Sequence, residues 1–231
     1  MTLSSMCAVH PNAPSVVTCR RCGRFCCTNC LPQFETCPEC VARATISVPP
    51  IEGRATVAMV ALIASVGMHA LMAAVACAQL ATGDVGEEGV LAIVGGLVAL
   101  LYLVVFITTI VLVCMWFHLA TRHALARGAS MEVETPAAAV GSWFIPFVNL
   151  ARPFNLVRRM LDSAGLDAGA VSAWQVLWIT GNITANISSR VGGMGGIGIG
   201  LLSDLFMVGA GITFVQIIRK LKWPPAAALV S

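Results

Sequence analysis

The sequence predicts an all-α membrane protein, a bundle of four transmembrane helices with an interfacial amphipathic helix, preceded by a small cysteine-rich domain. Hydrophobic residues make up 58% of the chain and charged residues only 11%, whereas soluble domains hold about 25% charged residues. Eight of the ten cysteines lie in the first 50 residues, which contain no long apolar run. The chain therefore divides into a cysteine domain at 1–45, a linker at 46–54 and a four-span membrane domain at 55–222.

Four short pairs of metal-binding residues follow one another in the cysteine domain. They are Cys7 and His10, Cys19 and Cys22, Cys27 and Cys30, and Cys37 and Cys40. Each pair forms a tight turn that directs two ligand atoms at one ion, and two pairs complete a tetrahedral structural zinc site. Because the N-terminal stretch lacks an apolar secretory signal, we expect a reducing cytosolic location, where clustered cysteines bind metal. We therefore predict two bound Zn²⁺ ions.

The spacing leaves open whether neighbouring pairs or alternate pairs share an ion. Over residues 7–40 the pattern resembles the B-box zinc finger, although its last pair is Cys-Cys where that family usually has histidines. B-boxes interleave their pairs in a cross-brace, so the resemblance implies two ligand sets: Cys7, His10, Cys27 and Cys30, and Cys19, Cys22, Cys37 and Cys40. Cys26 is left over, and it either replaces Cys27 or is a buried small apolar residue. Because the domain has few apolar residues, we expect it to unfold without metal.

The charge of the cysteine domain argues against nucleic-acid binding. Residues 1–54 hold five arginines and three glutamates, and seven thiolates with two Zn²⁺ ions bring the net charge to about −1. A nucleic-acid interface would be strongly basic. Closed zinc sites also leave no open position for catalysis. We therefore expect a module that faces a cytosolic protein partner.

Four apolar segments predict membrane-spanning helices, at about 55–81, 90–118, 171–189 and 194–218. Around 20 residues suffice to cross a bilayer. Lysine and arginine favour the cytosolic side, and with this topology thirteen of the fourteen fall on one side, Arg190 being the exception. We therefore expect a multi-pass protein of the plasma membrane with both termini in the cytosol. Four tryptophans near the cytosolic boundary are interpreted as interfacial anchors, with ordinary packing as the alternative: Trp116, Trp143, Trp174 and Trp223.

The segment between the second and third spans predicts an interfacial helix at about 153–164. Pro153 suits a first helical position and Gly165 suits a C-terminal cap. The apolar face combines Phe154, Val157 and Leu161, whereas Arg152 and Arg159 lie on another face. This pattern is typical of a basic amphipathic helix at a membrane surface.

A Trp-x-x-Pro-x-x-Asn-Leu-x-x-Pro motif precedes this helix, formed by Trp143, Pro146, Asn149, Leu150 and Pro153. With this motif the chain resembles, over residues 55–222, an uncharacterised family of bacterial four-span membrane proteins, domain of unknown function 4328. The resemblance implies an architecture and no activity. The prolines interrupt the helix, and Asn149 can hydrogen-bond the backbone groups that the break releases. We expect a structural elbow, with a ligand or lipid-headgroup site as the alternative.

Polar residues within the predicted spans suggest a second candidate site. Gln175, Asn182 and Asn186 form one stripe on the third span, and Asp204 lies at a similar depth in the fourth, where it could meet them. A central Asp costs roughly 2.5–3.5 kcal/mol on insertion scales, whereas one intramembrane hydrogen bond contributes about 0.6 kcal/mol. Asp204 must therefore be protonated, paired, multiply hydrogen-bonded or hydrated. His69 in the first span either joins a relay or packs as a buried histidine.

The sequence thus supports two hypotheses of function. The first is a non-enzymatic membrane adaptor or sensor, in which the zinc module recruits a cytosolic protein and the lipid-embedded bundle anchors it. The alternative is a small transporter or channel that uses the polar residues around Asp204. We expect no enzymatic activity, because no catalytic constellation and no open metal site are visible. The sequence allows a homo-oligomer but does not require one.

Overall fold

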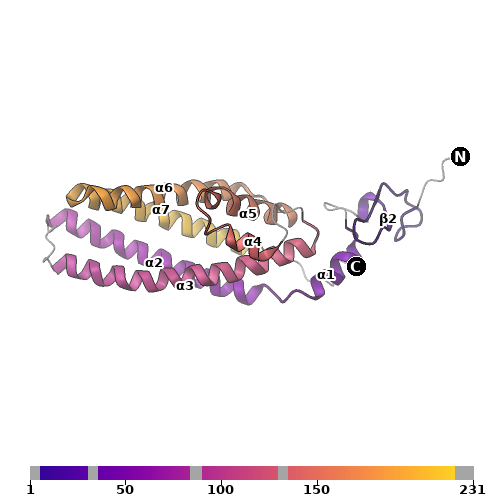
Figure 1. Cartoon of the computed structure of the whole chain (residues 1–231), viewed down its shortest axis with the longest axis horizontal. Helices are drawn as coiled ribbons and strands as arrows, with labels where there is room; N and C mark the ends of the chain where they lie inside the picture. The colour runs from indigo at the N-terminus through magenta and orange to yellow at the C-terminus, as the bar shows by residue number, and fades with distance from the viewer. Residues whose placement is uncertain (1–5, 31–35, 84–89, 130–134, 222–231) are drawn as a thin grey trace.

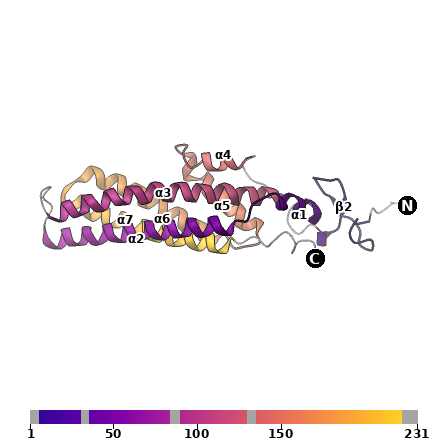
Figure 2. The same ribbon diagram turned by 90° about the horizontal axis from the view of Figure 1, so that it is seen from below.

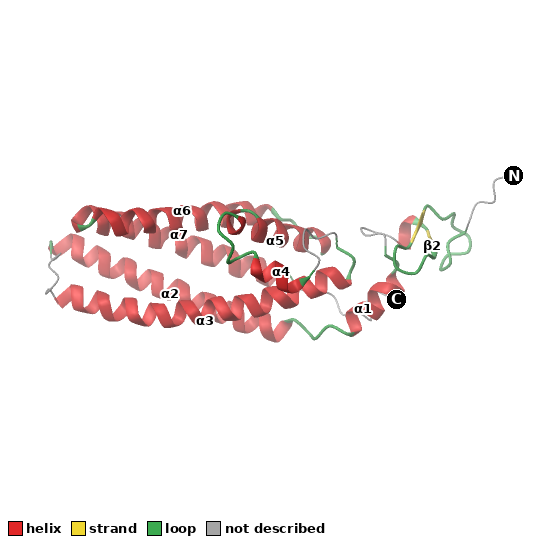
Figure 3. Ribbon diagram, viewed as in Figure 1, coloured by secondary structure: helices red, strands yellow, loops and turns green. Residues whose placement is uncertain are grey.

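The computed structural model describes residues 6–30, 36–83, 90–129 and 135–221. A small N-terminal module lies at one end of a long helical bundle (Figure 1). Strand is confined to the module, and the rest is almost entirely helical (Figure 3). The protein therefore has the mostly helical structure that the sequence predicts, with a cysteine-rich module near its N-terminus.

The N-terminal module is built on tight turns rather than on regular structure. Strands β1 (Val17–Thr18) and β2 (Phe25–Cys26) pair antiparallel and are followed by a 3₁₀ turn, η1 (Thr28–Cys30). Helix α1 (Pro38–Ile46) begins with a proline in its first turn, where the missing N–H leaves no hydrogen bond unmade. The interior of the N-terminal module consists of buried cysteine side chains, with few other apolar side chains.

Three helices are long and apolar enough to cross a membrane: α2 (Glu52–Thr82), α3 (Val90–Ala126) and α7 (Gly193–Lys220). Helix α3 continues eight residues beyond the predicted end of the second span at residue 118. Helix α6 (Gly169–Val191) is the predicted third span. Its 23 residues reach about 34 Å at 1.5 Å per residue, which is long enough to cross a membrane. Because it carries more polar side chains, it is not among the three helices that are also apolar enough, and a fourth span stays a prediction.

The four long helices pack in the order α3, α2, α7, α6, so that α3 and α6 form the two edges of the arrangement. Small residues bring α6 and α7 together. A Cβ at Gly200 would lie 3.1 Å from Ser188 Oγ, and Ser203 Oγ donates a hydrogen bond to the Gly181 carbonyl at 2.9 Å. Gly196 and Gly200 lie four residues apart on one face of α7 and permit this close packing. The two helices therefore form a tight hairpin.

Helices α4 (Pro136–Gly141) and α5 (Arg152–Ser163) lie against the end of the bundle nearest the module (Figures 1 and 2). Between them is a second 3₁₀ turn, η2 (Val148–Leu150). The predicted apolar face of α5 is buried, and Leu156 and Met160 are buried beside it. Helix α5 therefore packs its apolar side into the protein core.

The core contains two of the tryptophans that the sequence suggested as interfacial anchors. Trp116 is fully buried and Trp174 is 2% exposed, and Trp174 stacks on Phe214 with ring centroids 4.2 Å apart and planes at 1°. For these two residues the anchor interpretation is wrong, because the faces of α3 and α6 that carry them point into the protein core. Trp143 is partly buried against the same core, and Trp223 lies outside the described residues.

Candidate metal centres and a buried polar cluster

The first and third Cys/His pairs of the module converge on one point. The ligand atoms of Cys7, His10, Cys27 and Cys30 all lie within 4.8 Å of one another. The Sγ atoms of Cys7 and Cys30 are 3.6 Å apart, and His10 Nδ1 lies 3.2 Å from Cys30 Sγ and 3.5 Å from Cys27 Sγ. Four soft or borderline donors around one centre can hold a metal ion.

The second and fourth pairs form an equivalent cluster from Cys19, Cys22, Cys37 and Cys40. Cys22 Sγ lies 3.7 Å from Cys37 Sγ, and the backbone N–H of Cys37 donates to Cys19 Sγ at 3.2 Å. Alternate pairs therefore share a cluster, which is the cross-braced arrangement that the B-box resemblance implied and that spacing alone left open. Cys26 belongs to neither cluster. Its side chain is 1% exposed, and its Sγ lies 3.6 Å from the Arg24 carbonyl.

The thiols within each cluster have opposite acid–base character. Burial acts to raise the pKa of Cys7, but the backbone N–H groups of Val9, His10 and Cys27 outweigh it and lower that pKa to about 6. Burial and hydrogen bonds with neighbouring thiols raise the pKa of Cys30 to about 12. The second cluster repeats this pattern, with pKa values of about 6 and about 12, at Cys19 and Cys40. Neighbouring thiols thus share protons, and a cation at the centre favours the loss of those protons.

Two arginines near the clusters, Arg21 and Arg24, contact other residues of the same chain. Arg24 Nη1 contacts Glu39 Oε2 at 2.6 Å. Arg21 Nη1 donates to the carbonyl of Cys40 at 3.3 Å and to that of Ala126, near the end of α3, at 3.4 Å. Arg21 therefore ties the module to the helical bundle, and neither contact resembles a basic stripe presented to a polyanion.

A buried polar cluster joins three long helices near the middle of the bundle. His69 Nδ1 of α2 lies 2.8 Å from Asp204 Oδ1 of α7. Its other ring nitrogen, Nε2, lies 3.3 Å from the Tyr102 hydroxyl of α3. The side chains of His69 and Asp204 are only 11% and 17% exposed. The structure thus makes His69 the partner of Asp204 rather than a packing residue.

The polar stripe of α6 does not meet Asp204, contrary to expectation. Asn182 Nδ2 donates to the Trp178 carbonyl at 2.7 Å and lies 4.0 Å from Met207 Sδ of α7, and Asn186 Nδ2 donates to the Asn182 carbonyl at 2.9 Å. Ser203 faces α6, and successive side chains on an α-helix point in directions about 100° apart. The side chain of Asp204 therefore points away from α6 and toward α2.

Gln175 and the proline motif meet at the elbow between α4 and α5. Gln175 Nε2 donates to the Leu150 carbonyl at 2.9 Å, so the first residue of the stripe supports the motif. Trp143 contacts Trp174 in the core, with ring centroids 5.9 Å apart. The Asn149 side chain makes no hydrogen bond among the described residues, so its predicted bond to released backbone groups is not found.

The elbow contains a strained turn immediately after the first motif proline. The Val148 N–H donates to the Pro146 carbonyl at 2.8 Å, which makes Phe147 the centre of a γ-turn with φ 64° and ψ −37°. This is a rare conformation for a residue with a side chain. Pro153, the last motif residue, is buried in the first turn of α5. The motif therefore fixes a sharp turn and the start of the next helix.

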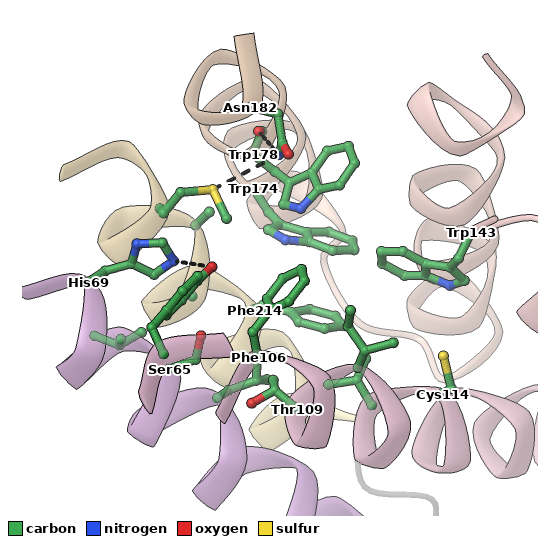
Figure 4. Close-up of a pocket in the computed structure, with 18 of the residues that line it drawn as sticks. Ser65, His69, Phe106, Thr109, Cys114, Trp143, Trp174, Trp178, Asn182 and Phe214 are labelled. Carbon is green, nitrogen blue, oxygen red and sulfur yellow. Dashed lines mark hydrogen bonds between the residues drawn. The ribbon is translucent and has the colours of Figure 1, made fainter. Parts of the chain in front are cut away.

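A cavity of about 320 Å³ lies between the long helices and the elbow. Figure 4 shows Trp174, Phe214 and Phe106 around its apolar part and His69 at its edge. Asn182 also lines it. The polar end of this cavity therefore adjoins the cluster formed by His69, Tyr102 and Asp204.

Tyr102 is the functional candidate that the sequence analysis missed. It is the only tyrosine in the chain, placed within an otherwise apolar stretch of α3. A tyrosine hydroxyl in such a stretch indicates a candidate site, because it needs a hydrogen-bond partner in the absence of water. Tyr102, Phe106 and Thr109 recur at helical spacing and all line the cavity.

Comparison with known families gives one match. A family model described as Domain of unknown function (DUF4328) matches residues 88–222. The match includes the proline motif, Tyr102 and Asp204, but α2 with His69 and the cysteine module precede it. No curated protein and no solved structure gave a significant match.

Proposed function

The chain belongs to the family described as Domain of unknown function (DUF4328), and from that premise we propose that it is a membrane adaptor whose cytosolic module holds two structural zinc ions. The observation that carries this proposal is the pair of closed four-ligand clusters. Each cluster uses four protein ligands, whereas catalytic zinc sites keep one position open. The module is therefore a stable binding surface rather than a reaction centre.

The ligand geometry favours zinc. Tetrahedral zinc with Zn–S bonds of about 2.3 Å and Zn–N bonds of about 2.0–2.1 Å separates two sulfurs by roughly 3.8 Å and a sulfur from a nitrogen by roughly 3.6 Å. The sulfurs of the first cluster are 3.6 and 3.9 Å apart, and the sulfur–nitrogen separations are 3.2, 3.5 and 4.0 Å. Cysteine thiolates with imidazole also exclude magnesium and calcium, which take oxygen ligands.

The surface of the module supports a protein partner. Val17 and Phe25 lie on the two strands with 38% and 48% of their surface exposed, and Val9 is 48% exposed nearby in the chain. A metal-centred module does not need these side chains for its interior. Exposed apolar groups on a nearly neutral module suit a protein contact better than a nucleic-acid contact.

The proposal places both termini in the cytosol and four helices across the plasma membrane. The ends of α2, α3 and α7 that carry Arg54, Arg122 and Arg219 lie at the end of the bundle nearest the module (Figure 1). Basic residues mark the cytosolic side of membrane proteins. Helix α6 packs along α7 and is long enough to span, which supports the fourth crossing.

Site-specific photo-crosslinking in the full-length chain tests the adaptor. A photoreactive residue at position 25, on the exposed strand, is expected to capture one protein from the cytosolic side of native membranes. Capture should disappear when Cys19→Ser removes a ligand of the second cluster. The matched control position is 46, where Ile46 is 76% exposed in α1, away from strands β1 and β2. Equal capture at both positions, or capture that survives metal removal, would contradict the proposal.

The contact between His69 and Asp204 favours a second function, a small proton-coupled transporter. His69 and Asp204 come from two different helices and lie 2.8 Å apart, and ionisable residues at this depth often mark proton or ion pathways. Purified protein in liposomes should then show a proton flux that Asp204→Asn abolishes and that Asn186→Ala, a residue bonded within α6, leaves unchanged. A flux that Asp204→Asn does not alter would exclude this function.

A further inference from the structure

The cavity between the long helices has a polar end and an apolar end. His69, Ser65 and Asn182 line the polar end, whereas aromatic rings line much of the remainder (Figure 4). Tyr102, which contacts His69, is also part of the lining. Its volume of about 320 Å³ lies within the lower range of small-molecule sites, roughly 300–1,000 Å³. A space of this size and two-ended character suits a single small amphiphilic molecule.

The polar end carries hydrogen-bonding atoms that the protein does not use. Among the described residues, the Ser65 hydroxyl makes no hydrogen bond, and the Asn182 side-chain oxygen accepts none. The Asn182 Nδ2 group is already bonded to the Trp178 carbonyl. Ser65 is partly buried and Asn182 is exposed on α6, and polar atoms in a low-dielectric setting need partners. A bound molecule with its own polar group would supply them.

The direction of the hydrogen bonds specifies the kind of polar group. The Asn182 side-chain oxygen can only accept a hydrogen bond, whereas the hydroxyl groups of Tyr102 and Ser65 can both accept and donate. All three side chains line the cavity. The Asn182 oxygen therefore requires a donor from the ligand, and the two hydroxyl groups can serve either role. A ligand hydroxyl group meets both needs, whereas a ketone or ester oxygen offers no donor to Asn182.

The charge of the lining excludes an ionic head group. No lysine, arginine, aspartate or glutamate lines the cavity in the described part of the chain. Any positive charge on His69 is already balanced by Asp204. A phosphate or carboxylate would therefore enter without a counter-ion, which is strongly unfavourable at low dielectric. The head group must be neutral.

The apolar part of the lining points to a ligand from the bilayer. Trp174 and Phe214, whose rings stack with centroids 4.2 Å apart, supply aromatic surface that suits a hydrocarbon chain. The lining also includes residues of α2, α3 and α7, the helices that are apolar enough to cross a membrane. A molecule dissolved in the membrane therefore matches this lining better than a water-soluble one.

We propose that this cavity binds a neutral membrane-soluble alcohol, with its hydroxyl group at Tyr102 and Ser65 and its hydrocarbon body against Trp174 and Phe214. This site is independent of the zinc module and of the adaptor function. It assigns a lipid-like ligand to the membrane domain.

Tryptophan quenching in the full-length protein tests this site. The probe is a long-chain primary alcohol carrying bromine on its chain, added to the protein in lipid nanodiscs. Trp143, Trp174 and Trp178 line the cavity, so occupancy should quench fluorescence in a saturable way. The brominated fatty acid of the same length, ionised at pH 8, should bind at least tenfold more weakly.

Variants separate a specific site from simple partitioning into lipid. Tyr102→Phe and Ser65→Ala each remove one oxygen and should weaken binding of the alcohol roughly three- to tenfold, the range expected for one hydrogen bond. Ala210→Leu fills the apolar end and should abolish saturable quenching. The matched control is Thr108→Val, because Thr108 is exposed on α3 and bonds only within its helix.

Three results would overturn the proposal. One is quenching that rises in proportion to the alcohol in the membrane without saturation. The second is equal binding by wild type, Tyr102→Phe and Ser65→Ala. The third is binding of the fatty acid as tight as that of the alcohol, since the charge of the lining excludes it. Tyr102→Phe removes a single atom, so its result does not depend on whether Ala210→Leu folds.

Discussion

Removing either partner of the His69–Asp204 pair should destabilise the membrane domain by an amount that reveals its charge state. His69 lies near the middle of α2, whose 31 residues extend about 46 Å, so it falls well within a hydrocarbon core about 30 Å thick. Breaking a buried ion pair from one side costs about 3–5 kcal/mol. A neutral hydrogen bond in a membrane protein contributes about 0.6 kcal/mol and at most about 1.7 kcal/mol.

A double-mutant cycle distinguishes the two cases. We expect His69→Leu and Asp204→Leu each to lower the free energy of unfolding by about 3 kcal/mol, and the double variant to lose less than the sum, with a coupling energy above about 2 kcal/mol. The assay is denaturation of the full-length protein in mixed micelles, followed by tryptophan fluorescence. Thr108→Val combined with Asp204→Leu is the control and should show no coupling, since Thr108 bonds within α3. A coupling at or below about 0.6 kcal/mol for the His69 pair would refute the ion-pair interpretation.

Three further predictions concern packing, strain and metal binding. Gly181→Leu should separate α6 from α7 and lower the free energy of unfolding by about 1–3 kcal/mol in the same assay, because even a Cβ would lie 2.8 Å from Met207 Sδ; no loss would show that the hairpin is loosely packed. Phe147→Gly should raise the thermal midpoint, since it relieves a positive φ of 64° at a residue that is 85% exposed; a lower midpoint would mean that the Phe147 side chain contributes more than the strain removes. Bound metal should be released as the pH falls from 7.5 to 5, because protons compete for thiolates whose lowest pKa values are about 6. A colorimetric chelator measures that release, and release on raising the pH instead would contradict it.

The metal ligands could be predicted from sequence, but their partition between two ions could not. The spacing within each Cys/His pair identifies two ligands. Which second pair binds the same ion depends on how the turns fold in space. The backbone bond from Ala8 to Phe25 and the β1–β2 pairing bring the first and third pairs together. Only the resemblance to a known finger anticipated that arrangement.

The helices were predictable because apolar length is a local property. Which face of a helix meets which neighbour is a property of packing, so it could not be predicted from apolar length. Asp204 was expected near Asn182 at equal depth, but the Ser203–Gly181 contact turns Asp204 toward His69. Trp174 likewise points into the core rather than toward the membrane boundary.

The metal content of the purified full-length protein tests the central claim most directly. Mass spectrometry should find two zinc ions per chain in wild type, about one in Cys19→Ser, and two in the matched control Cys26→Ser, because Cys26 lies outside both clusters. Loss of one zinc in the control would assign Cys26 to a cluster. A wild-type protein prepared without chelators that contains no zinc would contradict the two-site account and remove the basis of the adaptor proposal.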